Sequence, residues 1–163
     1  MFARRNARRG LLASTAAGLL WIVTACGGSG LPDKVKYAAP PQAVLMGGVS
    51  VQFQLAHASD DVFKFRVYIQ NLSNPPQMMI INRDGFGLRL PDGRVLQRRG
   101  SAHEPYMLQP GQGHDVWVDF KEAGLDLRTV QQASVIVGGI AFGNDPMPRV
   151  VGEIPLTWAG PVD

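Results

Sequence analysis

GVSVQFQLA at residues 48–56 and VFKFRVYIQ at residues 62–70 are two neighbouring stretches in which apolar and polar residues alternate. Such alternation places apolar side chains on one face of a β-strand and polar side chains on the other. The inward positions predicted for the two stretches are Val49, Val51, Phe53 and Leu55, and Phe63, Phe65, Val67 and Ile69. We therefore expect two strands of an antiparallel hairpin, each with one buried face.

The remainder of the chain continues in short segments of the same kind. NLSNPP at 71–76 ends the second strand because its prolines cannot donate to a strand ladder. PDG at 91–93 is a hairpin signal, and YMLQPGQGHDVWVDF at 106–120 predicts two strands around a Pro-Gly turn. The pattern predicts an all-β domain over residues 43–163, a β-sandwich of about 7–9 short antiparallel strands.

The order of the motifs NLSN, LRLPDGRVLQ and LQPGQGHDVWVDF is similar to that in immunoglobulin-like domains of unknown function on bacterial lipoproteins. The resemblance covers roughly Val49 to Ile140 and implies an immunoglobulin-like β-sandwich. A more distant likeness is to the outer-membrane lipoprotein of type VI secretion, which is also a tethered β-sandwich. These motifs are turn sequences, so they bear on the fold and say little about activity.

The N-terminal 25 residues have the pattern of a signal peptide. MFARRNARR is a basic segment, and the 14 residues from Gly10 to Val23 that follow it carry no charge. As a helix this uncharged stretch spans about 21 Å, which is short of the ~30 Å hydrocarbon core of a bilayer. The length favours a cleaved export signal over a permanent membrane span. The Arg8-Arg9 pair is similar to a twin-arginine motif, and both this route and the general secretory route stay open.

The sequence Val23-Thr24-Ala25-Cys26 resembles the lipobox of bacterial lipoproteins. The resemblance implies a diacylglyceryl thioether on Cys26 and cleavage by the lipoprotein signal peptidase between Ala25 and Cys26. Only a thiol is nucleophilic enough for such chemistry near neutral pH. Cys26 is also the single cysteine of the chain, so an internal disulfide is excluded and lipidation accounts for the thiol. Two or three acyl chains would hold the protein on a membrane.

Two features near Cys26 refine this picture. The next residue is Gly27 rather than Asp, which in two-membrane bacteria resembles the pattern of lipoproteins sent to the outer membrane. We expect a location in the bacterial cell envelope, facing the periplasm if the source has two membranes. Residues 26–42 are rich in Gly, Pro and small side chains, and we interpret them as the lipidated cysteine followed by a flexible tether.

The charge distribution argues against a nucleic-acid partner. The formal net charge is +3, but Arg4, Arg5, Arg8 and Arg9 lie in the signal peptide and supply four of the 16 basic residues. The rest of the chain is therefore close to neutral, with both signs interspersed. A nucleic-acid footprint needs a stripe of positive charge, which this sequence does not have.

No catalytic or metal-binding motif stands out, and we expect neither an enzyme nor a bound cofactor. The Gly28-Ser29-Gly30 segment lacks the GxSxG spacing and the preceding strand of a hydrolase elbow. Asp115 and Asp119 would lie about 13 Å apart along a strand, too far to share a calcium ion. The sharper alternative is copper, because soft thioether and imidazole ligands suit Cu(I). Its candidate ligands fall in one half of the domain: Met78, Met79, His103, Met107 and His114.

Two aromatic residues are the candidates for contact with a partner. Trp117 alternates with inward-facing valines and would lie on the outer face between Asp115 and Asp119. Tyr68 is outward by the same alternation and would extend the patch if the two strands are neighbours. The sequence thus predicts a lipid-anchored envelope module that supports or binds another protein. The alternative is an exported lipoprotein that binds a small ligand or copper.

Overall fold

The computed structural model describes residues 31–98, 103–143 and 145–162. The predicted signal peptide and lipobox, including Ala25 and Cys26, lie outside these residues and stay predictions. No helix in the described ranges is long and apolar enough to span a membrane. The strands in these ranges are β1 Val35–Ala38, β2 Val44–Met46, β3 Val49–Ser59, β4 Val62–Asn71, β5 Met79–Ile81, β6 Gly87–Arg89, β7 Val95–Gln97, β8 Tyr106–Leu108, β9 Gly113–Lys121, β10 Gln132–Val137, β11 Ile140–Phe142, β12 Asp145–Arg149 and β13 Gly152–Pro161.

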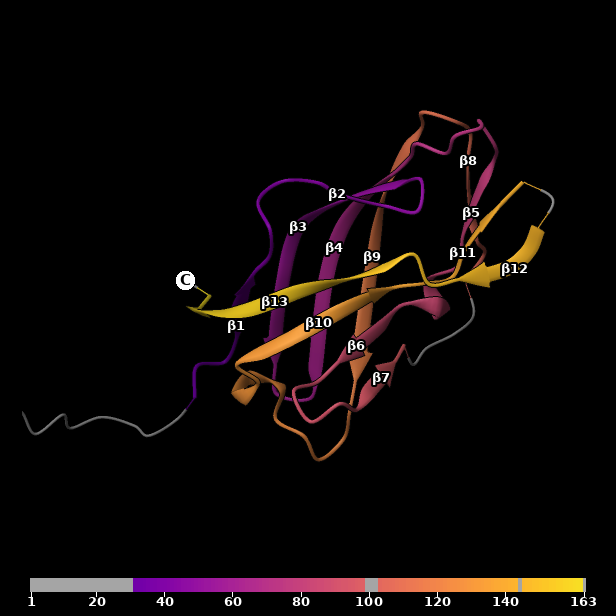
Figure 1. Cartoon of the computed structure of the whole chain (residues 1–163). Helices are drawn as coiled ribbons and strands as arrows, with labels where there is room; N and C mark the ends of the chain where they lie inside the picture. Colours follow the sequence, from indigo (N-terminus) through magenta and orange to yellow (C-terminus); the bar gives the residue numbers. More distant parts are fainter. Residues whose placement is uncertain (1–30, 99–102, 144, 163) are drawn as a thin grey trace, which may run out of the picture. The chain divides into compact units, whose positions relative to one another are not determined.

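These strands form two antiparallel sheets. The larger sheet has the order β7-β6-β10-β13-β1-β3-β4-β9, with β2 paired to β3, and the smaller has the order β12-β11-β5-β8. Figure 1 shows that the larger sheet curls back on itself, so that β13, β10 and β6 cross in front of β3, β4 and β9. The two layers enclose the core as in a sandwich. The prediction of an all-β antiparallel fold is confirmed, and a continuous curled sheet supplies both layers.

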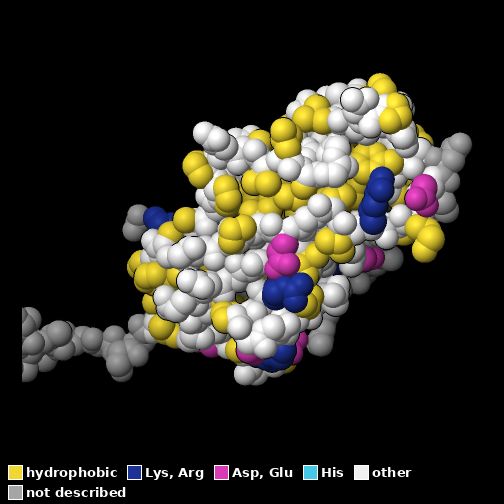
Figure 2. Space-filling view, viewed as in Figure 1, with side chains coloured by type: hydrophobic (Ala, Val, Ile, Leu, Met, Phe, Trp, Pro, Cys, Tyr) yellow, Lys and Arg dark blue, Asp and Glu magenta, His cyan; other side chains and the backbone are white. Residues whose placement is uncertain are grey.

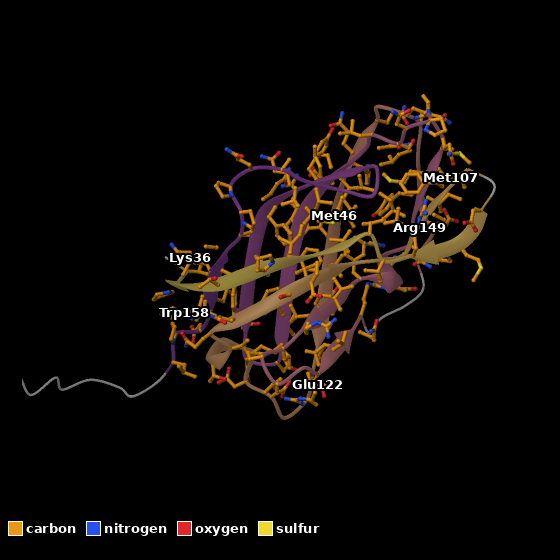
Figure 3. The ribbon with its side chains drawn as sticks, viewed as in Figure 1. Lys36, Met46, Met107, Glu122, Arg149 and Trp158 are labelled. Carbon is orange, nitrogen blue, oxygen red and sulfur yellow. The ribbon has the colours of Figure 1, made fainter. Side chains whose placement is uncertain are left out.

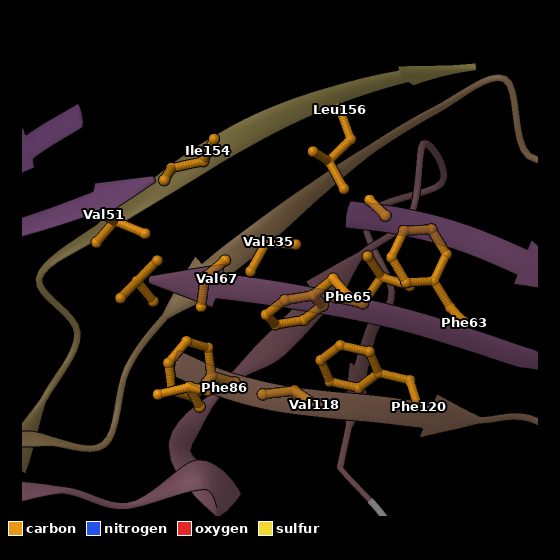
Figure 4. Close-up of a cluster of buried hydrophobic side chains, with 14 of the residues drawn as sticks. Val51, Phe63, Phe65, Val67, Phe86, Val118, Phe120, Val135, Ile154 and Leu156 are labelled. Carbon is orange, nitrogen blue, oxygen red and sulfur yellow. The ribbon is translucent and has the colours of Figure 1, made fainter. Parts of the chain in front are cut away.

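The core lies between the two layers and follows the predicted alternation. Phe65 of β4 is fully buried, and its ring centroid lies 5.7, 5.9 and 5.8 Å from those of Phe53, Phe86 and Phe120. Figure 4 shows side chains from β3, β4 and β9 meeting those of β10 and β13, with Val135, Ile154 and Leu156 labelled among the latter. Alternation along each strand therefore supplies one wall of a shared core.

The predicted tether is too long, and this part of the prediction is wrong. Val35–Ala38 forms β1, which pairs with β13 on one side and with β3 on the other. Val35 is fully buried and Tyr37 is nearly so. The folded unit begins at Leu31 rather than at residue 43. Four residues carry too little alternation to be recognised as a strand, and the C-terminal strand that pairs with them lies more than a hundred residues away.

Two short 3₁₀ helices, η1 at Arg83–Gly85 and η2 at Leu127–Thr129, complete the described fold. The second of these is fixed to β1 by Tyr37. The Tyr37 hydroxyl lies 3.0 Å from the carbonyl oxygen of Leu127 and 2.7 Å from that of Val130. Burial, with a smaller contribution from the charge of Asp126, raises the pKa of Tyr37 to about 12. The neutral phenol is therefore the form that the folded state requires.

Alkaline pH should lower the free energy of unfolding through ionisation of Tyr37. The pKa of Tyr37 is raised in the folded state, so its contribution is complete below the unfolded value near 10 and is lost as the pH rises through 12. We expect the wild type to lose about 2–3 kcal/mol of unfolding free energy over this interval. Tyr37→Phe should be less stable by about 1–2 kcal/mol at pH 8 and should lack this part of the alkaline loss. Urea unfolding followed across the pH series tests this, and parallel pH curves for the two proteins would contradict it.

The two sheets are joined at two tight junctions. The first is the corner between β10 and β11, where Gly138 and Gly139 lie in backbone contact with η1, and Asn82 donates its N–H to the Gly139 carbonyl at 2.8 Å. The second is the fully buried Asn71 at the end of β4. Its Nδ2 donates to the carbonyl oxygens of Gln77 and Leu108 at 2.8 and 3.0 Å, and its Oδ1 accepts from the Ser73 N–H at 3.1 Å.

Candidate functional site

The outer face of β4 and β9 brings together the two aromatic residues that the sequence indicated. In the register of these strands Arg66 lies opposite Trp117, and Tyr68 lies opposite Asp115. Trp117 and Tyr68 are therefore diagonal neighbours on the same face of the sheet. Trp117 is 46% exposed, a large value for an indole on a sheet surface.

A cation lies over the Trp117 ring. The Arg66 guanidinium carbon is 5.3 Å from the centroid of the Trp117 ring, and Arg66 Nη2 donates to Asp115 Oδ2 at 2.6 Å. This hydrogen bond from Arg66 is the main cause of a lowered pKa at Asp115. The pair is partly exposed, so we expect it to order the side chains more than to stabilise the fold. Its charges cancel, and the indole is held in place by the guanidinium.

Leu55 adds an aliphatic side chain to this surface, and here the sequence prediction is wrong. The alternation placed Leu55 in the core, yet it is 42% exposed and pairs with Arg66. The pairing of β3 with β4 shifts between Phe53 and Leu55, and beyond this irregularity the buried positions are Ala56 and Ala58. A bulge of this kind turns the following side chains to the other face.

We call this surface, made of Leu55, Arg66, Tyr68 and Trp117, the aromatic face. The Tyr68 ring lies close above Gly113, where a Cβ atom would be 2.1 Å from the tyrosine oxygen. On the Trp117 side of this face lies a shallow cavity of about 230 Å³, which is lined by Lys64, Trp117, Val118 and Asp119. Exposed aromatic and aliphatic groups around a neutralised ion pair suit contact with another macromolecule.

The structure separates two of the candidate copper ligands, Met79 and Met107. Met79 is fully buried on the inner face of the smaller sheet, whereas Met107 is 64% exposed. Ile80, not Met79, lies opposite Met107 in the register of β5 and β8. The His114 ring packs on Tyr106 with centroids 4.2 Å apart. In the part of the chain that the structure describes, no three His, Cys, Asp or Glu side chains are grouped to hold a metal ion.

A second apolar surface lies at the hairpin of β2 and β3, which the sequence analysis did not single out. Leu45 and Leu72 are 72% and 44% exposed, and they line a cleft of about 300 Å³ together with Met46 and Val49. Figure 2 shows hydrophobic side chains gathered over this part of the molecule and few charged ones on the face in view. The residues that line this cleft carry no polar or charged side chain to select a ligand, so the aromatic face is the better candidate.

The comparisons with known proteins leave the function open. No family model matches the chain, and no curated protein matches it significantly. Among solved structures it is similar to the yjhA protein of Bacillus subtilis, with a TM-score of 0.47 and 11% identity over 60% of this chain and 78% of that one. The structural-genomics target SoR45 gives 0.47 and 13% over 70% and 89% of the two chains. A Bordetella pertussis protein given the name ApaA gives 0.40 and 17% over 77% and 94%.

Proposed function

We propose that this protein is a lipid-anchored module of the bacterial cell envelope that binds another envelope protein through its aromatic face. The sequence Val23-Thr24-Ala25-Cys26 behind an uncharged segment supports the anchor. The residue after Cys26 is Gly27 rather than an aspartate, which supports the outer membrane as its site in a two-membrane source. The role is one of binding rather than catalysis, and the exposed Trp117 beside Arg66 is the observation that carries it.

The geometry of the aromatic face is what a binding surface requires. Tryptophan, tyrosine and arginine are the residue types that most often dominate the energy of a protein interface. Arg66 is already held by Asp115 at 2.6 Å, so little side-chain freedom remains to be lost on binding. Leu55 extends the apolar area on the other side of Arg66. The cavity beside Trp117 is small, about 230 Å³, and a small cavity of this kind fits a protein partner better than a small molecule.

The anchor is tested by the intact mass of protein extracted from membranes. We expect wild-type protein to begin at Cys26 and to carry two or three acyl chains. Cys26→Ser should keep residues 1–25, since neither the thioether nor the cleavage that depends on it can form. A wild-type mass without lipid would contradict the anchor and leave the single thiol unexplained.

The binding role is tested at Trp117. We expect Trp117→Ala to weaken association with the partner protein about 30-fold, the loss typical of an aromatic residue at the centre of an interface. The partner is first identified by cross-linking in native membranes, and its affinity for purified variants is then measured by titration. Met107→Ala is the matched control because Met107 is an exposed apolar residue on the smaller sheet, and its affinity should equal that of the wild type. Equal affinities for all three proteins would contradict the role of the aromatic face.

A further inference from the structure

A polar pocket of about 130 Å³ adjoins the turn that joins β2 to β3. Its walls are the backbone of Gly47 and Gly48, the loop that follows β4, and the side chains of Phe142 and Arg149. Among the described residues that line it, Arg149 alone is charged, so the pocket is positive. We call it the Arg149 pocket.

Arg149 is held by stacking rather than by an ion pair. Its guanidinium carbon lies 5.0 Å from the centroid of the Phe142 ring. Within the part of the chain that the structure describes, no carboxylate lies at ion-pair distance from Arg149. Asp145 Oδ1 instead accepts a backbone N–H at 3.1 Å, and Glu153 pairs with Arg89 at 2.8 Å. A guanidinium stacked on a ring keeps N–H donors at its edge, so Arg149 remains able to bind an anion.

The Arg149 pocket adjoins the apolar cleft at the hairpin of β2 and β3. The Gly47-Gly48 turn lines both, and Leu72 of the cleft is followed in the chain by Ser73 of the pocket. Figure 3 shows Met46, which lines the cleft, and Arg149 in the same upper part of the view. One ligand that carries both an anion and an apolar group can therefore occupy the two together.

We propose that this site binds the C-terminal end of an extended peptide whose last side chains are apolar. The terminal carboxylate pairs with the guanidinium of Arg149, whose planar fork matches a carboxylate. The amide side chains of Asn74 and Gln77 line the same pocket and supply further donors. The apolar side chains lie in the cleft against Leu45 and Met46. A single cation suits the one charge of a carboxylate better than a phosphate group, which carries up to two.

The form of the cleft favours a peptide over a fatty acid. Leu45 and Leu72 are 72% and 44% exposed, so an acyl chain there would stay largely in water, whereas small-molecule sites bury most of their ligand. Among the described strands β2 pairs only with β3, so its other edge offers N–H and C=O groups to an extended chain. A fatty acid cannot use these groups. The site shares no residue with the aromatic face, so its ligand is a separate one and does not depend on the proposed function.

The test uses the protein as cells produce it, immobilised on beads in detergent. A mixture of short synthetic peptides with randomised C-terminal residues is passed over the beads, once as free acids and once as C-terminal amides. Retained peptides are identified by mass spectrometry. We expect the free acids to be retained about tenfold better than the amides, because an amide lacks the charge that Arg149 recognises. The retained acids should be enriched in leucine, valine, isoleucine or phenylalanine at the last position.

Matched variants locate the effect. Arg149→Gln should retain acids and amides equally, whereas Arg94→Gln removes an exposed arginine paired with Asp92 and should keep the preference. Leu45→Asn should lower the retention of both forms, and its fold should be intact because Leu45 is exposed. Equal retention of acids and amides by the wild type would overturn the inference, and so would a preference that persists in Arg149→Gln. Binding of dodecanoate without retention of any peptide would also overturn it and assign the site to a lipid amphiphile.

Discussion

Replacing Gly139 by alanine is expected to lower the free energy of unfolding by about 3–5 kcal/mol. Gly139 has a φ of +71°, and a Cβ atom there would lie 2.1 Å from the Asn82 carbonyl oxygen and 3.0 Å from the Gly85 Cα. Both obstacles are backbone atoms, which cannot move aside as a flexible side chain does. The chain must therefore separate η1 from the corner between β10 and β11. Urea unfolding of the full chain measures the loss.

Gly124→Ala is the matched control for this substitution. Gly124 has a φ of +83°, but a Cβ atom there would meet nothing within 4 Å. Its replacement carries only the cost of the left-handed backbone, about 1–2 kcal/mol. The excess loss at Gly139 measures the close contact of the two segments. Equal losses at the two positions would show that the junction can relax and would contradict the expected result.

Replacing Asn71 by leucine is expected to cost about 3 kcal/mol. Leucine has nearly the shape of asparagine, so the space is filled while all three side-chain hydrogen bonds are lost. The Leu108 carbonyl oxygen and the Ser73 N–H are the groups that would be left without this partner. Because Asn71 is fully buried, water cannot replace the amide without opening the structure. The unfolding free energy of the full chain is again the measurement.

Ser73→Ala provides the comparison for Asn71→Leu. Ser73 Oγ donates to the Gln77 carbonyl oxygen at 3.1 Å, but this hydrogen bond is exposed. Water can replace it, so the expected loss is below about 1 kcal/mol. If Asn71→Leu were as mild as Ser73→Ala, the amide would not be the link between β4 and the smaller sheet.

Both positions lie where the chain passes between the sheets, and this explains why local pattern did not reveal them. Gly138-Gly139 reads as a turn in the sequence, and Asn71 reads as the polar end of a strand. The demands on them come from Gly85 and Leu108, which are distant in the chain. The requirement for a glycine or an asparagine at these positions comes from contacts between distant segments, which the alternation of apolar and polar residues does not encode.

The sequence by itself determined the strands whose apolar faces are long. From Phe63 to Ile69 every second residue is apolar, and each of these positions is buried in the structure. The same holds from Val116 to Phe120, and this alternation predicts the outward positions of Trp117 and Tyr68 between the buried residues. Period-two alternation is a local property, so one segment is enough to assign its two faces.

The tertiary structure alone decided which segments meet. It added Val35 and Tyr37 to the sheet by pairing β1 with β13, and it turned Leu55 outward through the irregularity in the β3–β4 pairing. It also brought Lys36 of β1 and Lys64 of β4 onto one face, on either side of His57. Alternation fixes how a strand is oriented about its own axis but carries no information about its neighbours or register. Those depend on how the whole set of apolar faces is buried at once.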